Sequence, residues 1–349
     1  MIRQRSYASV PSQKFIAEVQ QWGRPSACGR RPRRPLDLLY VRESRTRGSA
    51  QAICRMNQFY HGLLALLVLA VLAAAGCSRS RPIVVGSKAS TEQMLLGEIA
   101  AQHLEHRLGR KIERRLSLGG TLITFQSLQN GEIGLYPEYT GAIETEILKE
   151  PPSDVPALVF ERARGEMRRV AQSELLDPLG IDNRFVAVIR SDDPRAAKVS
   201  TLSEAAEATS AWKVGVSYDF QQRPDGLPAL SLYRLPMLAS VRSLEPGLVF
   251  KTAEQGQVSL IAANATDAPL DLKEWKVLRD DRNVFPPYQA CLLVKLDVLA
   301  AEPRLQGALA ELSGRFTTEK MRQLNAQVDL YHRPVAEVAA TFLAQARLK

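Results

Sequence analysis

The sequence has few of the residues on which common enzyme and metal sites depend. Its 349 residues include 4 Cys, 4 His and 3 Trp, and no HExxH, CxxC or GxSxG motif occurs. Only Cys291 follows residue 77, which excludes an internal disulfide for the rest of the chain. A lone Cys in the apolar run ACLLV at 290–294 is typical of a small buried side chain. We therefore expect no catalytic Cys, no metal and no cofactor.

Positive charge is confined to the N-terminal region. The formal net charge is +9, and residues 1–77 hold 12 Lys or Arg against 3 Asp or Glu, which accounts for the whole surplus. From Ser78 onward, 34 basic residues balance 34 acidic residues, so this part lacks the basic surface that binds a polyphosphate. We therefore expect no nucleic-acid partner. Apolar residues at 45% are typical of a globular protein.

No apolar run is long enough to span a membrane. The run LLALLVLAVLAAA at 63–75 is shorter than the roughly 20 residues of a spanning helix and has the length of a signal-peptide core, about 7 to 15 residues. It leads into LAAAGC at 72–77, which resembles a bacterial lipobox. We expect residues 56–77 to be a lipoprotein signal peptide, with Cys77 as the lipidated residue that anchors the protein to a membrane of the cell envelope, in the periplasm. Residues 1–55 show no periodicity and are predicted to be disordered or a wrongly assigned extension.

The remaining chain alternates between strand and helix patterns. A strand at 83–85 precedes a helix that starts near Thr91, with Ser90 and Gln93 in a capping-box pattern. The helix has an apolar stripe that stops at Gly109 and consists of Met94, Leu95, Ile99, Leu104 and Leu108. A second series of strands and helices starts at Phe185, and three amphipathic helices near 297–312, 318–327 and 334–346 follow. This alternation predicts an α/β protein with two lobes and mainly parallel sheets. Its ligand would lie between the lobes, beyond the carboxyl ends of the strands.

Two further patterns are weak indications of a site. His103 and His106 are spaced i, i+3 on the first predicted helix, beside Glu98 and Glu105. Two histidines make an incomplete metal site, so a partly exposed helical surface is the favoured interpretation. The segment GGT at 119–121 opens a helix and either binds an anion through backbone N–H groups or forms a tight turn.

Aromatic residues gather at the ends of predicted elements. YPEYTG at 136–141 places two tyrosines after a strand, and FPPY at 285–288 places two aromatic residues around a diproline. Rings at such joints more often pack in a core than form a ligand cage. The pattern alone therefore does not decide between the two.

Several segments, in this order along the chain, resemble the osmoprotectant family of ABC-importer substrate-binding proteins, the receptors for glycine betaine, choline, carnitine and related quaternary amines. They are GSKASTEQMLLGEI (86–99), LGGT (118–121), NGEIGLYPEYTGA (130–142), FQQRPDG (220–226), NATD (264–267), DDRNVFPPYQA (280–290) and LSGRFTTEKMRQLNAQVD (312–329). The resemblance covers the chain from about Ile83 to its C-terminus. It implies a bilobal type II periplasmic-binding-protein fold, with residues 78–184 and 286–349 in the first lobe and residues 185–285 in the second.

The resemblance also implies how the ligand is held. A quaternary ammonium group has no N–H donor, and aromatic faces attract it with about 0.5 to 2 kcal/mol each. Tyr139 and Tyr288 fall on cage positions, and Phe185 replaces a cage tyrosine. Arg223 falls on the clamp for a ligand carboxylate. The other implied ligand-binding residues lie in the first binding loop and in the NATD segment: Lys88, Gln93, Asn264 and Asp267.

Three departures from the family pattern bear on the ligand. Phe185 lacks the tyrosine hydroxyl, Asn264 stands in place of an aromatic residue, and Ala142 stands in place of a threonine. The leading hypothesis is a monomeric, lipid-anchored receptor that delivers a quaternary amine to an inner-membrane permease. The alternative is a sensor or assembly lipoprotein with the same fold and a site altered for another small polar solute. An enzyme ranks last, because no acid–base pair is identifiable.

Overall fold

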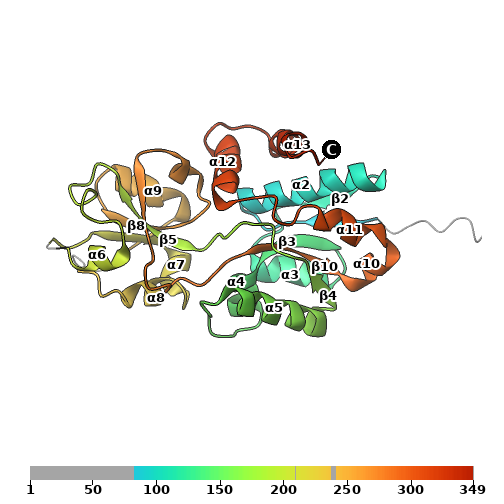
Figure 1. Ribbon diagram of the computed structural model, residues 1–349, viewed down its shortest axis with the longest axis horizontal. Helices are drawn as coiled ribbons and strands as arrows, with labels where there is room; N and C mark the ends of the chain where they lie inside the picture. The colour runs from blue at the N-terminus through green and yellow to red at the C-terminus, as the bar shows by residue number, and fades with distance from the viewer. Residues whose placement is uncertain (1–81, 209, 237–240, 349) are drawn as a thin grey trace, which may run out of the picture. The chain divides into compact units, whose positions relative to one another are not determined.

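The computed structural model describes residues 82–208, 210–236 and 241–348 (Figure 1). Arg79–Lys349 forms one compact unit, in which the strands make two five-stranded sheets, each covered by helices. We call each sheet with its helices a lobe. The predicted extension 1–55, the signal peptide 56–77 and the lipid site Cys77 lie outside the described residues.

The first lobe contains the sheet with strand order β2-β1-β3-β10-β4. The strands are β1 Val84–Gly86, β2 Glu113–Arg115, β3 Leu135–Tyr139, β4 Ser173–Leu175 and β10 Ala290–Lys295. Figure 1 shows helices on both faces of this sheet. On one face are α2 Thr91–Leu108, α11 Arg304–Ala310, α12 Thr318–Asp329 and α13 Val335–Gln345. On the other are α3 Thr121–Gln129, α4 Thr140–Ala142 and α5 Pro156–Ala171, with the π-helix η1 Ile143–Ile147 after α4, while α10 Leu296–Ala301 follows β10.

The second lobe contains the sheet with strand order β7-β6-β8-β5-β9. The strands are β5 Phe185–Arg190, β6 Val214–Ser217, β7 Arg242–Leu244, β8 Leu260–Asn264 and β9 Trp275–Leu278. The helices are short: α6 Leu202–Ala206, α7 Tyr218–Gln222, α8 Leu227–Ser231 and α9 Val249–Glu254, with the 3-10 turns η2 Pro246–Leu248 and η3 Ala268–Asp271.

The two-lobed α/β fold is confirmed, and each sheet is mainly parallel, with one reversed strand. In the first sheet β1 is parallel to β2 and β3, whereas β10 is antiparallel to β3 and β4. The second sheet repeats this pattern, with β5 antiparallel to β8 and β9. The reason is the connection between lobes: β5 and β10 are the strands that follow the two crossings, and each enters its sheet against the direction of its neighbours. The predicted residue bounds of the lobes stay a prediction.

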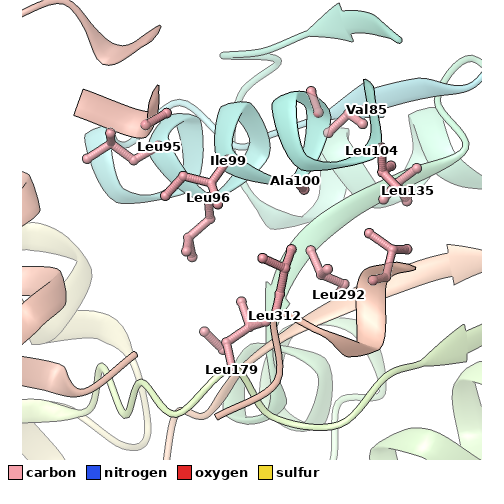
Figure 2. Packing of buried hydrophobic residues seen from close by; sticks show 14 of the residues in the cluster. Val85, Leu95, Leu96, Ile99, Ala100, Leu104, Leu135, Leu179, Leu292 and Leu312 are labelled. Carbon is pink, nitrogen blue, oxygen red and sulfur yellow. The ribbon is translucent and has the colours of Figure 1, made fainter. Parts of the chain in front are cut away.

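The core of the first lobe confirms the apolar stripe predicted for the first helix. Figure 2 shows Leu95, Ile99 and Leu104 along α2; all three are buried and belong to the same core cluster as Val85, Leu135 and Leu292 of the strands. Gly109 ends α2 in the left-handed conformation, at φ 65°. The predicted capping box is wrong, because Ser90 occupies the N-cap position without a side-chain hydrogen bond.

Two expectations about apolar segments can be checked. Cys291 is fully buried in β10, as a small core side chain is expected to be. Among the described residues, no helix is both long enough and apolar enough to cross a bilayer.

Candidate functional site

A pocket of about 800 Å³ is lined by residues of both lobes. Its lining comes from segments that follow the carboxyl ends of parallel strands: Lys88 after β1, Asp219 after β6 and Thr266 after β8. This is the position expected for the ligand of such a fold. Pockets of this volume accommodate small organic molecules.

Seven of the eight residues predicted for the site line this pocket. The exception is Gln93, which is fully buried in α2 and whose side-chain nitrogen and oxygen have no hydrogen-bond partner. The seven are Lys88, Tyr139, Phe185, Arg223, Asn264, Asp267 and Tyr288. Phe185 and Asn264 are also cross-strand partners, because the start of β5 pairs with the end of β8.

Three aromatic rings meet in the pocket. The centroid of the Tyr288 ring lies 6.2 Å from that of Tyr139 and 6.4 Å from that of Phe185. Phe185 is supported from behind by Phe220, edge to face at 4.8 Å, and by Phe285 at 6.5 Å. Tyr139 ends β3, Phe185 begins β5 and Tyr288 shortly precedes β10, so the ends of these strands bring the three rings together.

Cationic side chains of the protein already lie over these rings. The Lys88 ammonium nitrogen is 4.7 Å from the Tyr139 ring centroid. The guanidinium carbon of Arg223 is 5.2 Å from the centroid of Phe185 and 5.1 Å from that of Tyr288. These distances are within the range of cation–π attraction. The pocket rings therefore have the orientation that attracts positive charge.

Each of these two cations is paired with buried carboxylates. Lys88 lies 2.5 Å from a carboxylate oxygen of Glu138, which is fully buried. Arg223 donates two hydrogen bonds to the buried Asp225, at 3.0 and 2.8 Å, and a third to Glu146 in η1 at 3.1 Å. The Arg223 guanidinium thus joins the two lobes, and the donors predicted to clamp a ligand carboxylate are already engaged with the protein.

Another part of the pocket is acidic, and of its carboxylates only Asp267 is among the predicted site residues. Glu92 accepts hydrogen bonds from the Tyr139 hydroxyl at 2.5 Å and from the Asn325 amide at 3.2 Å. Burial raises the pKa of Glu92 although these bonds oppose the shift. Burial likewise raises the pKa of Asp267 to about 6, with added repulsion from Glu92 and Asp329. Both carboxylates are therefore placed where their negative charge is poorly solvated.

The residues that were missed did carry a weak signal. Glu92 directly precedes the predicted Gln93, and Asn325 and Asp329 are spaced i, i+4 in the quoted segment at 312–329. That spacing places both on one face of α12. Thr91 and Asp329 are joined by a 2.6 Å hydrogen bond although they are 238 residues apart in the sequence. The segment that packs against this face of α12 could therefore not be predicted from a local pattern.

The histidine pair and the GGT segment, the two weak indications of a site in the sequence, have different outcomes. His103 is fully buried, and its ring nitrogens lie 3.0 Å from the backbone oxygen of Leu348 and 2.9 Å from that of Ala308. The expected partly exposed surface is therefore wrong for His103, which fastens α2 to the C-terminal segment. Within the described ranges, no group of three or more His, Cys, Asp or Glu side chains is arranged to hold a metal ion. The GGT segment at 119–121 lines the pocket.

A comparison with protein-family profiles finds a match that covers most of the chain. The profile described as "Substrate binding domain of ABC-type glycine betaine transport system" matches residues 81–345. The chain belongs to this family. Because the family consists of solute-binding domains, the expectation that this protein is not an enzyme is confirmed.

Relatives and solved structures agree with this assignment. The carnitine transport binding protein OpuCC of Listeria monocytogenes is 27% identical over 78% of this chain and 89% of its own length. The ergothioneine transport permease/ergothioneine binding protein EgtU of Helicobacter pylori is 29% identical over 80% of this chain, which spans only 51% of that protein. A crystal structure described as a glycine betaine/carnitine/choline ABC transporter has a TM-score of 0.70 at 23% identity, covering 76% of this chain and 99% of that one. The chain is thus a substrate-binding protein of the ABC-type glycine betaine transport family.

Proposed function

We propose that this protein is a lipid-anchored, extracytoplasmic receptor that binds a quaternary amine in the pocket between its lobes and delivers it to an ABC permease in the inner membrane. The observation that carries this proposal is the meeting of Tyr139, Phe185 and Tyr288 in one pocket. Aromatic faces are the groups that attract a cation without N–H donors, which hydrogen bonds cannot hold.

The charge of the pocket supports the same class of ligand. Its lining contains the two cations Lys88 and Arg223 and five carboxylates: Glu92, Glu146, Asp219, Asp267 and Asp329. A pocket with this excess of acidic groups favours a positively charged ligand.

Binding would couple to the arrangement of the lobes. Tyr139 belongs to the first lobe and Phe185 to the second, so a ligand that contacts both rings favours the arrangement in which both contacts are made. The permease would then meet a receptor whose lobe arrangement depends on whether a ligand is bound. Attachment through Cys77 would keep that receptor at the membrane, an inference that the lipobox-like segment at 72–77 supports.

Thermal unfolding of the purified full-length protein tests the proposal. Glycine betaine, choline, carnitine and proline betaine are each added, and at least one is expected to raise the melting temperature. Tyr139→Ala should abolish the rise, whereas Tyr331→Ala should preserve it, because Tyr331 is 58% exposed and does not line the pocket. No rise with any of the four compounds would overturn the assignment of the ligand class.

The lipid anchor needs a separate measurement. Mass spectrometry of the protein extracted from membranes is expected to find a diacylglyceryl group on Cys77. Cys77→Ser should release the protein from the membrane fraction. A Cys77→Ser protein that stays in the membrane fraction would contradict the anchor without affecting the ligand assignment.

A further inference from the structure

We propose that the pocket selects a ligand with net positive charge that also donates a hydrogen bond, and that an acceptor wall formed by Glu92, Asp267, Asp329 and the Asn325 side-chain oxygen makes this selection. The inference rests on the proposed function and narrows it. Among trimethylammonium compounds, a cation with a hydroxyl group would be preferred to a zwitterion with a carboxylate.

The three carboxylates of the acceptor wall come from different parts of the chain. Glu92 lies in the first turn of α2, Asp267 follows β8 and Asp329 ends α12. Within the part of the chain that the structure describes, none of the three forms an ion pair with Lys, Arg or His. Their hydrogen bonds come instead from neutral donors, such as the Tyr139 hydroxyl on Glu92 and the Asn264 backbone N–H on Asp267 at 2.9 Å. Lys88 attracts Glu92 from beyond ion-pair distance, and a ligand cation can balance these carboxylates at closer range.

Asn325 gives independent evidence for a hydrogen-bond donor in the ligand. It lines the pocket, is 4% exposed, and its amide nitrogen donates to Glu92 at 3.2 Å and to the backbone oxygen of Thr266 at 2.9 Å. Because both of these partners are acceptors, the orientation of the amide is fixed with its nitrogen toward them. The side-chain oxygen of Asn325 then has no partner. A buried acceptor without a donor is costly, and a ligand hydroxyl or N–H group would satisfy it.

The other charged part of the pocket offers little to a carboxylate. Lys88 is neutralised by Glu138, and Arg223 by Asp225 and Glu146. A ligand carboxylate placed there would have to compete with these protein carboxylates for the same donors. A carboxylate placed at the acceptor wall would meet like charge and acceptors only. Both positions therefore disfavour a zwitterion relative to a cation.

The wall is suited to an organic cation rather than to a metal ion. Across the described residues, no group of three or more His, Cys, Asp or Glu is arranged as a metal site. The space beside the wall belongs to a pocket of about 800 Å³ that also contains three aromatic rings. A molecule with a methylated ammonium group and a nearby donor can contact the rings and the wall together.

Three compounds separate the two parts of the inference. Choline is a cation with a hydroxyl donor, its methyl ether has the same charge without the donor, and glycine betaine has the same head group with a carboxylate. Calorimetric titration of the full-length protein at pH 7.5 is expected to show that choline binds at least tenfold more tightly than glycine betaine and severalfold more tightly than the ether. Equal or tighter binding of glycine betaine overturns the inference and leaves the proposed function standing. Equal binding of the ether overturns the hydrogen-bond part, and no binding of any compound overturns the proposed function together with the inference.

Substitutions in the acceptor wall test whether it causes the preference for choline over glycine betaine. Glu92→Gln keeps the size of the side chain and removes its charge. We expect this variant to weaken the affinity for choline at least tenfold and to change the affinity for glycine betaine less. Asp267→Asn is the second variant, in case Glu92→Gln lowers the melting temperature too far. Asp192→Asn is the control, since Asp192 carries the same charge, has a 67% exposed side chain and pairs with Arg190 outside the pocket. If the control changes the preference as much as the wall variants do, the wall does not make the selection.

Discussion

Gly141 offers a way to displace one ring of the pocket without touching the ring itself. Gly141 lies in the short helix α4, and a Cβ atom added there would lie less than 3.0 Å from three atoms of the Tyr288 ring. The ring has little room to yield, because Tyr288 is buried and its hydroxyl donates to the buried Asp225 at 2.7 Å. Gly141→Ala must therefore push the Tyr288 ring or the backbone of α4 out of place.

The expected effects follow from this crowding. Overpacking of a buried site costs about 1 to 3 kcal/mol, and each kcal/mol lowers the melting temperature of a domain of this size by about 2 to 4 °C. A ring displaced from a quaternary ammonium group loses about 0.5 to 2 kcal/mol of attraction, which corresponds to about a 2-fold to 30-fold weaker affinity. Gly141→Ala should thus lower both stability and affinity.

Calorimetric titration and thermal unfolding measure the two effects, with Gly165→Ala as the matched control. Gly165 lies inside α5 and a Cβ atom there would meet no atom within 4 Å. Because Ala has a higher helix propensity than Gly, this control is expected to stabilise the protein by up to about 1 kcal/mol with no change in affinity. If Gly141→Ala behaves like Gly165→Ala in both measurements, the Tyr288 ring does not lie against Gly141 and the description of the pocket is wrong.

Three further predictions concern charge and reactivity. Asp267, with a pKa of about 6 in place of 3.8, becomes protonated as the pH falls from 7 to 5, and the affinity for choline should fall over this range. The contribution of Asp267 to the free energy of unfolding becomes more favourable over the same range, because the folded state holds the proton more tightly than the unfolded state. Titrations and urea unfolding at several pH values would show both trends, and a wild-type profile that coincides with that of Asp267→Asn would contradict them. Arg223→Met leaves the buried Asp225 without its cation and is expected to lower the free energy of unfolding by about 3 to 5 kcal/mol in urea; a loss below about 1 kcal/mol would show that the pair is not buried. Burial raises the pKa of the Cys291 thiol, so peptide mass spectrometry should find Cys291 unmodified by iodoacetamide in the native protein, and rapid labelling would refute its burial.

Local patterns along the chain predicted the elements of the first lobe well. The apolar spacing of α2 and the Gly109 stop are both properties of a single helix, and both are confirmed. The capping box at Ser90 failed although the residue types were right. A cap of this kind does form in α6, where Thr201 and Glu204 bond reciprocally. Residue type permits a cap, and the surrounding packing decides whether the side chain makes the bond.

The features that could not be predicted depend on contacts between distant segments. The direction of the one reversed strand in each sheet is set by how the chain returns from the other lobe, which periodicity does not encode. The acceptor wall depends on the approach of α12 to the start of α2, and no local pattern places Asn325 against Glu92. The ring positions follow from the family resemblance, because the aromatic pattern alone does not distinguish a ligand cage from core packing.

The two segments that connect the lobes lie side by side, because Asp182 and Gln289 form an antiparallel bridge and the Asn183 N–H donates to the Tyr288 backbone oxygen at 2.9 Å. Asn183 and Tyr288 also line the pocket. The connection between the lobes and the pocket therefore share Asn183 and Tyr288. A substitution at either position that alters the ligand preference is expected to alter the packing of the two connecting segments as well.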